Sequence, residues 1–64
     1  MTQKELSYIE DAIGHEKNII SILKESIKNL ENEELINFLE NEINKHTNTQ
    51  EKLINMLEVK SNEW

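Results

Sequence analysis

The chain has 64 residues and no cysteine, and its formal net charge of −6 comes from thirteen acidic residues against seven lysines. A chain of this length forms at most one small domain, which without disulfides generally needs a metal or an oligomer to complete its core. Phosphate binding requires a basic surface, so the acidic balance argues against nucleic acid as a partner. No secretion signal is visible, and no apolar run reaches the roughly 20 residues that span a bilayer. We expect a cytoplasmic protein with no membrane partner.

The first predicted helix begins at a capping box and covers residues 3–30. Thr2 and Glu5 have the spacing at which each side chain bonds the backbone N–H of the other. Apolar residues then recur every three or four positions, the period of one helix face. Gly14 either weakens this helix or permits a close contact beside it. This first seam consists of Leu6, Ile9, Ile13, Glu16, Ile20, Leu23, Ile27 and Leu30.

The second predicted helix covers residues 33–60, after a turn at about residues 30–33 and before a short tail, 61–64, in which Trp64 joins no seam. Asn29 is suited to close the first helix and Asn32 to cap the second. Because the connection is short, the two helices should lie antiparallel as neighbours. The second seam consists of Ile36, Leu39, Ile43, His46, Gln50, Leu53 and Leu57.

The two seams match each other in an antiparallel register. In two antiparallel helices, the residue numbers of every pair of facing positions add up to the same total. Seven pairs of seam residues, from Leu30–Ile36 to Ile9–Leu57, have one common total. Both seams become polar at the same layer, where Glu16 falls opposite Gln50 and His46 lies one step away. The sequence therefore predicts one helical hairpin with a polar layer at its middle.

A second apolar stripe follows the seam on each helix and predicts an oligomer. Seam and stripe together form an apolar arc broader than a two-stranded coil needs, and a helix with such an arc packs against two neighbours. A hairpin offers each helix only one neighbour, so we expect two hairpins to pair with two-fold symmetry into an all-α four-helix bundle. The residues predicted at this interface are Tyr8, Ala12, His15, Ile19, Ile22, Leu35, Phe38 and Met56.

The polar layer has three interpretations. It can fix register and oligomeric state, as a buried polar residue does in coiled coils, with His46, Gln50 and water satisfying Glu16. It can be a metal site for Fe, Mn or Zn, because Glu16, Glu42 and His46 are carboxylate and imidazole ligands that two-fold pairing would supply twice. It can also be a solvated edge position. The sequence has no glycine-rich phosphate loop and no serine grouped with a histidine and an acid, so we expect no enzyme and no resident cofactor.

Three segments resemble the Coat F family of bacterial spore coat proteins: residues 6–17 (LSYIEDAIGHEK), 32–35 (NEEL) and 44–53 (NKHTNTQEKL). The likeness covers nearly all of the chain. It implies a ferritin-like helical hairpin, an endospore-forming source and an association with the spore coat and its proteins. In such relatives an acid of the first helix matches Glu16, and a pair of ligands on the second helix falls here on His46 and Thr49. Because threonine is not a strong ligand, the resemblance implies a degenerate site.

Overall fold

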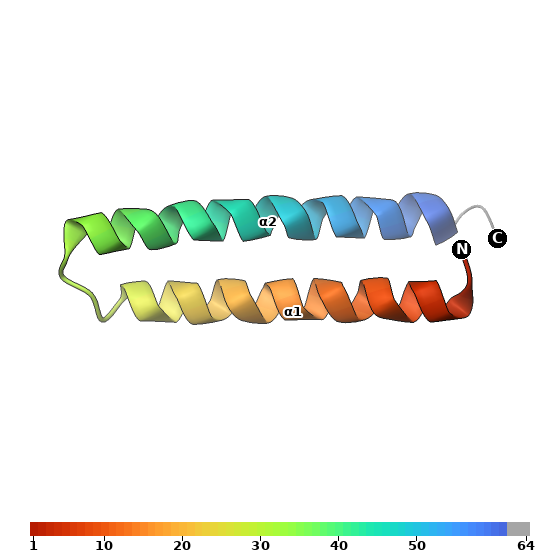
Figure 1. Ribbon diagram of the computed structural model, residues 1–64, viewed down its shortest axis with the longest axis horizontal. Helices are drawn as coiled ribbons and strands as arrows, with labels where there is room; N and C mark the ends of the chain where they lie inside the picture. Colours follow the sequence, from red (N-terminus) through yellow and green to blue (C-terminus); the bar gives the residue numbers. More distant parts are fainter. Residues whose placement is uncertain (62–64) are drawn as a thin grey trace.

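The chain forms a helical hairpin (Figure 1) in the computed structural model, which describes residues 1–61. Helix α1 covers Gln3–Ile27 and helix α2 covers Glu33–Ser61. They lie side by side and antiparallel in a rod of 49 × 14 × 11 Å. The described part of the chain contains no strand, so the predicted all-α hairpin is confirmed. Trp64 and the rest of the predicted tail after Ser61 lie outside the described residues.

Helix α1 begins with the predicted capping box. The Thr2 hydroxyl accepts a hydrogen bond from the Glu5 backbone N–H at 3.1 Å, and the Glu5 carboxylate accepts one from the Thr2 backbone N–H at 2.8 Å. Hydrogen bonding to Thr2 lowers the pKa of Glu5 below its usual value of 4.5. The Thr2 backbone has the larger effect and the Thr2 side chain the smaller one. The two bonds satisfy N–H groups that have no partner inside the helix.

Helix α1 ends at Ile27, three residues before the end that the seam predicts. The Asn29 and Leu30 backbone N–H groups bond to carbonyls three residues earlier, Ser26 and Ile27, each at 3.1 Å. This tighter bonding ends the α-helical pattern although the apolar spacing continues to Leu30. The connection is therefore residues 28–32, slightly longer than the predicted turn. Leu30 still lies half-buried, so the seam extends beyond the helix that carries most of it.

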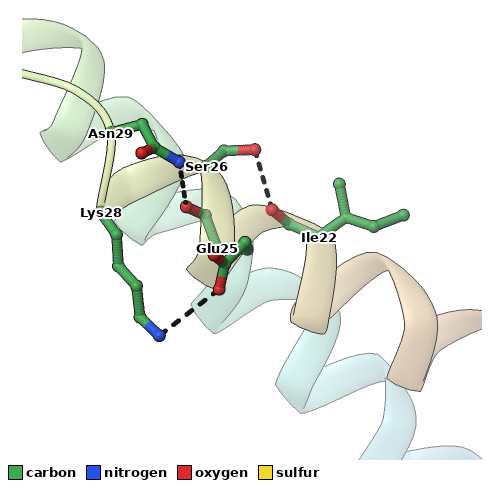
Figure 2. A network of polar contacts seen from close by, with 5 residues as sticks. All are labelled: Ile22, Glu25, Ser26, Lys28 and Asn29. Atoms are coloured by element: carbon green, nitrogen blue, oxygen red, sulfur yellow. Dashed lines mark hydrogen bonds and ion pairs between the residues drawn. The ribbon is translucent and has the colours of Figure 1, made fainter.

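A group of exposed polar contacts covers this end of α1 (Figure 2). The Asn29 side-chain amide donates to the Glu25 carbonyl at 3.2 Å, and the Ser26 hydroxyl donates to the Ile22 carbonyl at 2.8 Å. Lys28 Nζ lies 3.4 Å from Glu25 Oε2. Asn29 thus closes α1 as predicted, because its amide satisfies a carbonyl of the last turn.

Helix α2 begins at the predicted cap. Asn32 Oδ1 accepts a hydrogen bond from the Leu35 backbone N–H at 2.9 Å. Glu33 and Glu34 occupy the first turn, where the positive end of the helix dipole stabilises acids. Caps at both ends of the connection therefore fix where the chain reverses.

The core of a single hairpin is thin. Ile20 is the one buried hydrophobic residue in the part of the chain that the structure describes. The other apolar residues of both seams are half-buried, so each side chain touches the facing helix on one side only. No described helix is long and apolar enough to cross a membrane. The hairpin alone buries little of the apolar surface that usually stabilises a domain.

The surroundings of Gly14 decide between its two interpretations. A Cβ placed on Gly14 would meet no atom within 4 Å, and its backbone is not in the positive-φ region that favours glycine. Gly14 is exposed and lies on the side of α1 away from the seam. It therefore makes no close helix contact in the hairpin.

We predict that Gly14→Ala raises the free energy of unfolding by about 0.5–1 kcal/mol, because alanine loses less backbone entropy in a helix interior. Thermal and urea unfolding followed by circular dichroism would measure the change. Ala12→Gly, on the same helix, should lower stability by a similar amount. A Gly14→Ala protein less stable than the parent would contradict the open surroundings.

Candidate functional site

Glu16 and His46 meet at the middle of the hairpin, one from each helix. Glu16 Oε2 lies 2.5 Å from His46 Nδ1, and the two side chains are 17% and 30% exposed. An ionised carboxylate can only accept, so the Nδ1–H of His46 donates in this bond. The polar layer predicted from the two seams therefore contains a direct contact between residues 30 positions apart in the sequence.

The partner of Glu16 differs from the one that the register places opposite it. A seam residue of one helix lies among four residues of the facing helix, so Glu16 can reach either His46 or Gln50. The bond to His46 joins the Glu16 carboxylate to an imidazole nitrogen. Gln50 is half-buried in the same seam. The register alone therefore leaves two possible partners, and the structure shows the bond with His46.

Glu42, the third predicted metal ligand, does not join this pair. Glu42 Oε1 lies 3.6 Å from Lys45 Nζ. Each of the two residues directly precedes a seam residue, Ile43 or His46, and so continues the second stripe of α2 between Phe38 and Met56. The Thr49 hydroxyl donates to the Lys45 backbone carbonyl at 3.0 Å, a bond within its own helix. Among the described residues of one chain, no three histidine, aspartate or glutamate side chains are grouped closely enough to hold a metal ion. A single hairpin thus brings together two of the three predicted ligands.

The predicted interface residues lie at the surface of the hairpin. Tyr8, Ile22 and Phe38 are 62%, 64% and 58% exposed. Leu35, Met56 and His15 are also exposed, whereas Ala12 and Ile19, nearest to the seam, are half-buried. Val59 is exposed in the same stripe of α2 and extends it toward the chain termini. Exposure of several large apolar side chains in one stripe is informative, because residues of these types are usually buried.

Both stripes lie on the same flat side of the hairpin. Successive residues of a helix are rotated by about 100°, which places each stripe roughly a quarter turn from the seam of its own helix. Because α1 and α2 run in opposite directions, equal rotations in sequence bring both stripes to one side. We call this side the apolar face; it consists of Tyr8, Ala12, His15, Ile19, Ile22, Leu35, Phe38, Met56 and Val59.

The opposite side of the hairpin is polar. On α1 it presents Glu10, Lys17 and Ser21, all exposed, and on α2 it presents Glu51 and Glu58. Ile54 is the large apolar residue on this side among the described residues, and it stands alone. A single exposed apolar side chain is ordinary, whereas a contiguous set of them indicates an interaction surface. The hairpin therefore has one face suited to water and one suited to a partner.

No protein-family model, curated protein or solved structure matches the chain. The resemblance to the Coat F family stays a prediction of the sequence. The functional interpretation accordingly depends on two features of the hairpin itself, the Glu16–His46 pair and the apolar face.

We predict that Glu16→Leu leaves the free energy of unfolding equal or raises it, because replacing a partly buried polar group with a packed apolar one is often neutral or stabilising. The same variant should lose a single oligomeric state if the layer specifies register. Thermal unfolding and sedimentation measure the two effects. Glu10→Leu, which removes an exposed acid of the same helix, is the control. A loss of more than about 1 kcal/mol with Glu16→Leu alone would show that the pair contributes net stability.

Proposed function

We propose that the protein is a non-enzymatic structural or interaction protein that assembles with itself. In this proposal two hairpins pair through their apolar faces into a ferritin-like four-helix bundle with two-fold symmetry. The observation that carries it is the exposure of the apolar face, with Phe38 and Ile22 more than half exposed. A side chain of this size contributes roughly 1.5–3 kcal/mol when it becomes fully buried.

The thin core of the hairpin supports the same proposal. Domains of about 60 residues are marginally stable even when their core is well formed, and shorter ones commonly need disulfides, a metal or an oligomer. The chain has no cysteine, so disulfides do not contribute. Pairing of two hairpins would cover the apolar face and the half-buried seams together. A second copy is thus the simplest source of the missing core.

The polar layer fits a register role within this assembly. Glu16 is bonded to His46, Glu42 lies beside Lys45, and Thr49 bonds within its own helix. Glu16, Glu42 and Thr49 therefore each have a partner within the chain, as expected for a layer that specifies alignment. The resemblance to the Coat F family adds the proposed setting, deposition on the spore coat from the cytoplasm together with other coat proteins.

We predict that the protein sediments as a dimer at micromolar concentration, with twice the 7.6 kDa mass of one chain. Phe38→Glu should shift it to monomer, because the interface would then have to bury an unpaired charge. Ile54→Glu, an apolar-to-acid change on the opposite side of the same helix, should leave the dimer intact. A well-folded monomer of the parent protein at these concentrations would contradict the proposed assembly.

A metal-binding bundle is the second candidate function, and the Glu16–His46 pair is the observation that favours it. Carboxylate oxygen and imidazole nitrogen are ligands that iron, manganese and zinc accept. Two-fold pairing would bring two such pairs into one bundle, with Glu42 as a further acid on each stripe. The resemblance to the Coat F family places a metal ligand at the position of Thr49, and Thr49 offers only a hydroxyl there.

We predict that, if the second candidate holds, purified protein contains stoichiometric metal or binds Fe(II), Mn(II) or Zn(II) with measurable heat. Elemental analysis and titration calorimetry provide the measurements, and His46→Gln, which removes the imidazole ligand, should abolish binding. His15→Gln controls for the second histidine, which lies outside the pair. Absence of both metal and heat would exclude this candidate and leave the assembly proposal unaffected.

A further inference from the structure

Along α2 the side of the hairpin that carries the apolar face has two apolar ends and a polar middle, whereas on α1 its middle is Ile19. The terminal patch, near the N-terminus of α1 and the C-terminal end of α2, consists of Tyr8, Ala12, Met56 and Val59. The loop patch, near the connection, consists of Ile22, Leu35 and Phe38. On α2 the two patches are separated by Glu42, Lys45, Thr49 and Lys52. A partner that fits the α2 part of this face must repeat the order apolar, polar, apolar.

A second copy can cover the face in two symmetric ways. If the two-fold axis runs along the helices, both connections lie at the same end and α1 of one copy faces α2 of the other. If the axis runs across the helices, the connections lie at opposite ends and each helix faces its own copy, antiparallel. We infer that the second arrangement forms, an inference that rests on the proposed self-assembly and specifies how the copies are oriented.

The α2 stripe is complementary to itself when it is reversed. In each of four pairs the two residue numbers have the same total, so all four pairs face each other in one antiparallel register. These pairs are Leu35 with Val59, Phe38 with Met56, Glu42 with Lys52 and Lys45 with Thr49 of the second copy. Apolar side chains meet at both ends of the stripe, and an acid meets a base in the middle. Symmetry supplies every pair twice.

The α1 stripe fits the same axis position. The α2 pairs are centred on one level of the bundle, and in the hairpin register that level is also the level of Ile19 on α1. Ile19 of one copy therefore faces Ile19 of the other copy near the two-fold axis. His15 then lies within one residue of the level of Ile22 of the second copy. Ala12 faces Ser26, and two small residues allow the helices to approach closely. The apolar middle of α1 is covered by the apolar middle of its copy.

The arrangement with both connections at one end matches the face poorly. Every residue then keeps its own level along the bundle, so Ile19 and Ile22 face Lys45 and Thr49 of the second copy. Glu42 and Lys52 lie ten residues apart along α2, about 15 Å at the rise of a helix, and do not meet. Only the terminal patch finds an apolar partner. Burial of Lys45 against isoleucine is unfavourable, because the charges of Lys45 and of Glu42 beside it would lose water without gaining a new partner.

The inference is tested by a distance between two labelled copies. The chain has no native cysteine, so Glu33→Cys with a spin label gives one label per copy at the start of α2, outside the apolar face. Opposite connections place the two labels about 40 Å apart, since they are separated by roughly 28 residues of helix at 1.5 Å each. Connections at one end place them under about 25 Å apart, within two helix diameters.

Ser21→Cys is the matched control, because it lies near the middle of the rod and should give nearly the same label distance in either arrangement. A long distance for Glu33→Cys with a normal Ser21→Cys signal supports the inference. A short distance overturns the orientation while the dimer itself stands. Absence of any distance between copies, with a monomer in sedimentation, overturns the proposed assembly and the inference with it.

A charge exchange tests the α2 pairing independently. Lys52→Glu faces Glu42 of the second copy with a like charge at two symmetric positions, so the dimer dissociation constant should rise about tenfold. The double variant Glu42→Lys with Lys52→Glu should recover most of the loss. Lys17→Glu, the same change of charge on the polar side of α1, should have little effect. Equal weakening by Lys52→Glu and Lys17→Glu, or no recovery in the double variant, would contradict the pairing.

Discussion

The packing of α1 against α2 along one antiparallel seam is the interaction on which the rest of the structure depends. It aligns two helices of 25 and 29 residues over nearly their whole length. It also brings Glu16 to His46 and turns both second stripes to one side. Because the connection is short and capped at both ends, the register cannot shift without breaking the caps and moving the polar layer against apolar residues.

The seam buries only part of the apolar surface of the hairpin, and the rest of that surface remains exposed. With Ile20 as the one buried hydrophobic residue among those described, a single hairpin leaves much of its apolar surface in contact with water. Hydrophobic stabilisation is roughly proportional to the apolar area removed from water. The same face that makes the isolated hairpin unfavourable would therefore supply the driving force for the proposed pairing. In that proposal stability and association depend on one set of side chains.

The polar layer has a different role from the apolar face. A carboxylate inside an apolar seam lowers stability unless a partner satisfies it, and His46 is that partner. The contact defines which level of α1 faces which level of α2, information that a uniform row of isoleucine and leucine does not contain. The same two residue types bind metals in other proteins, so the proposed register role and the proposed metal site begin from one geometry. The two proposals differ in whether a second copy adds metal ligands to the Glu16–His46 pair.

The sequence by itself determined the two helices, their caps and the seam, because each of these depends on local spacing. The capping box of Thr2, the cap at Asn32 and the period of the apolar residues are visible without any long-range contact. The end of α1 was predicted three residues too late, since apolar spacing continues to Leu30 while the backbone bonds tighten after Ile27. Helix ends depend on backbone hydrogen bonds, which the apolar period does not record.

Only the tertiary structure decided which polar groups meet. The register placed Gln50 opposite Glu16, yet the bond forms with His46, because a seam residue reaches several positions of the facing helix. Glu42, three residues from Lys45 on the exposed stripe, lies beside that lysine instead of joining the pair. The open surroundings of Gly14 were likewise settled by the fold. Local pattern fixes which face of a helix a residue occupies, whereas its partner depends on distances across two helices.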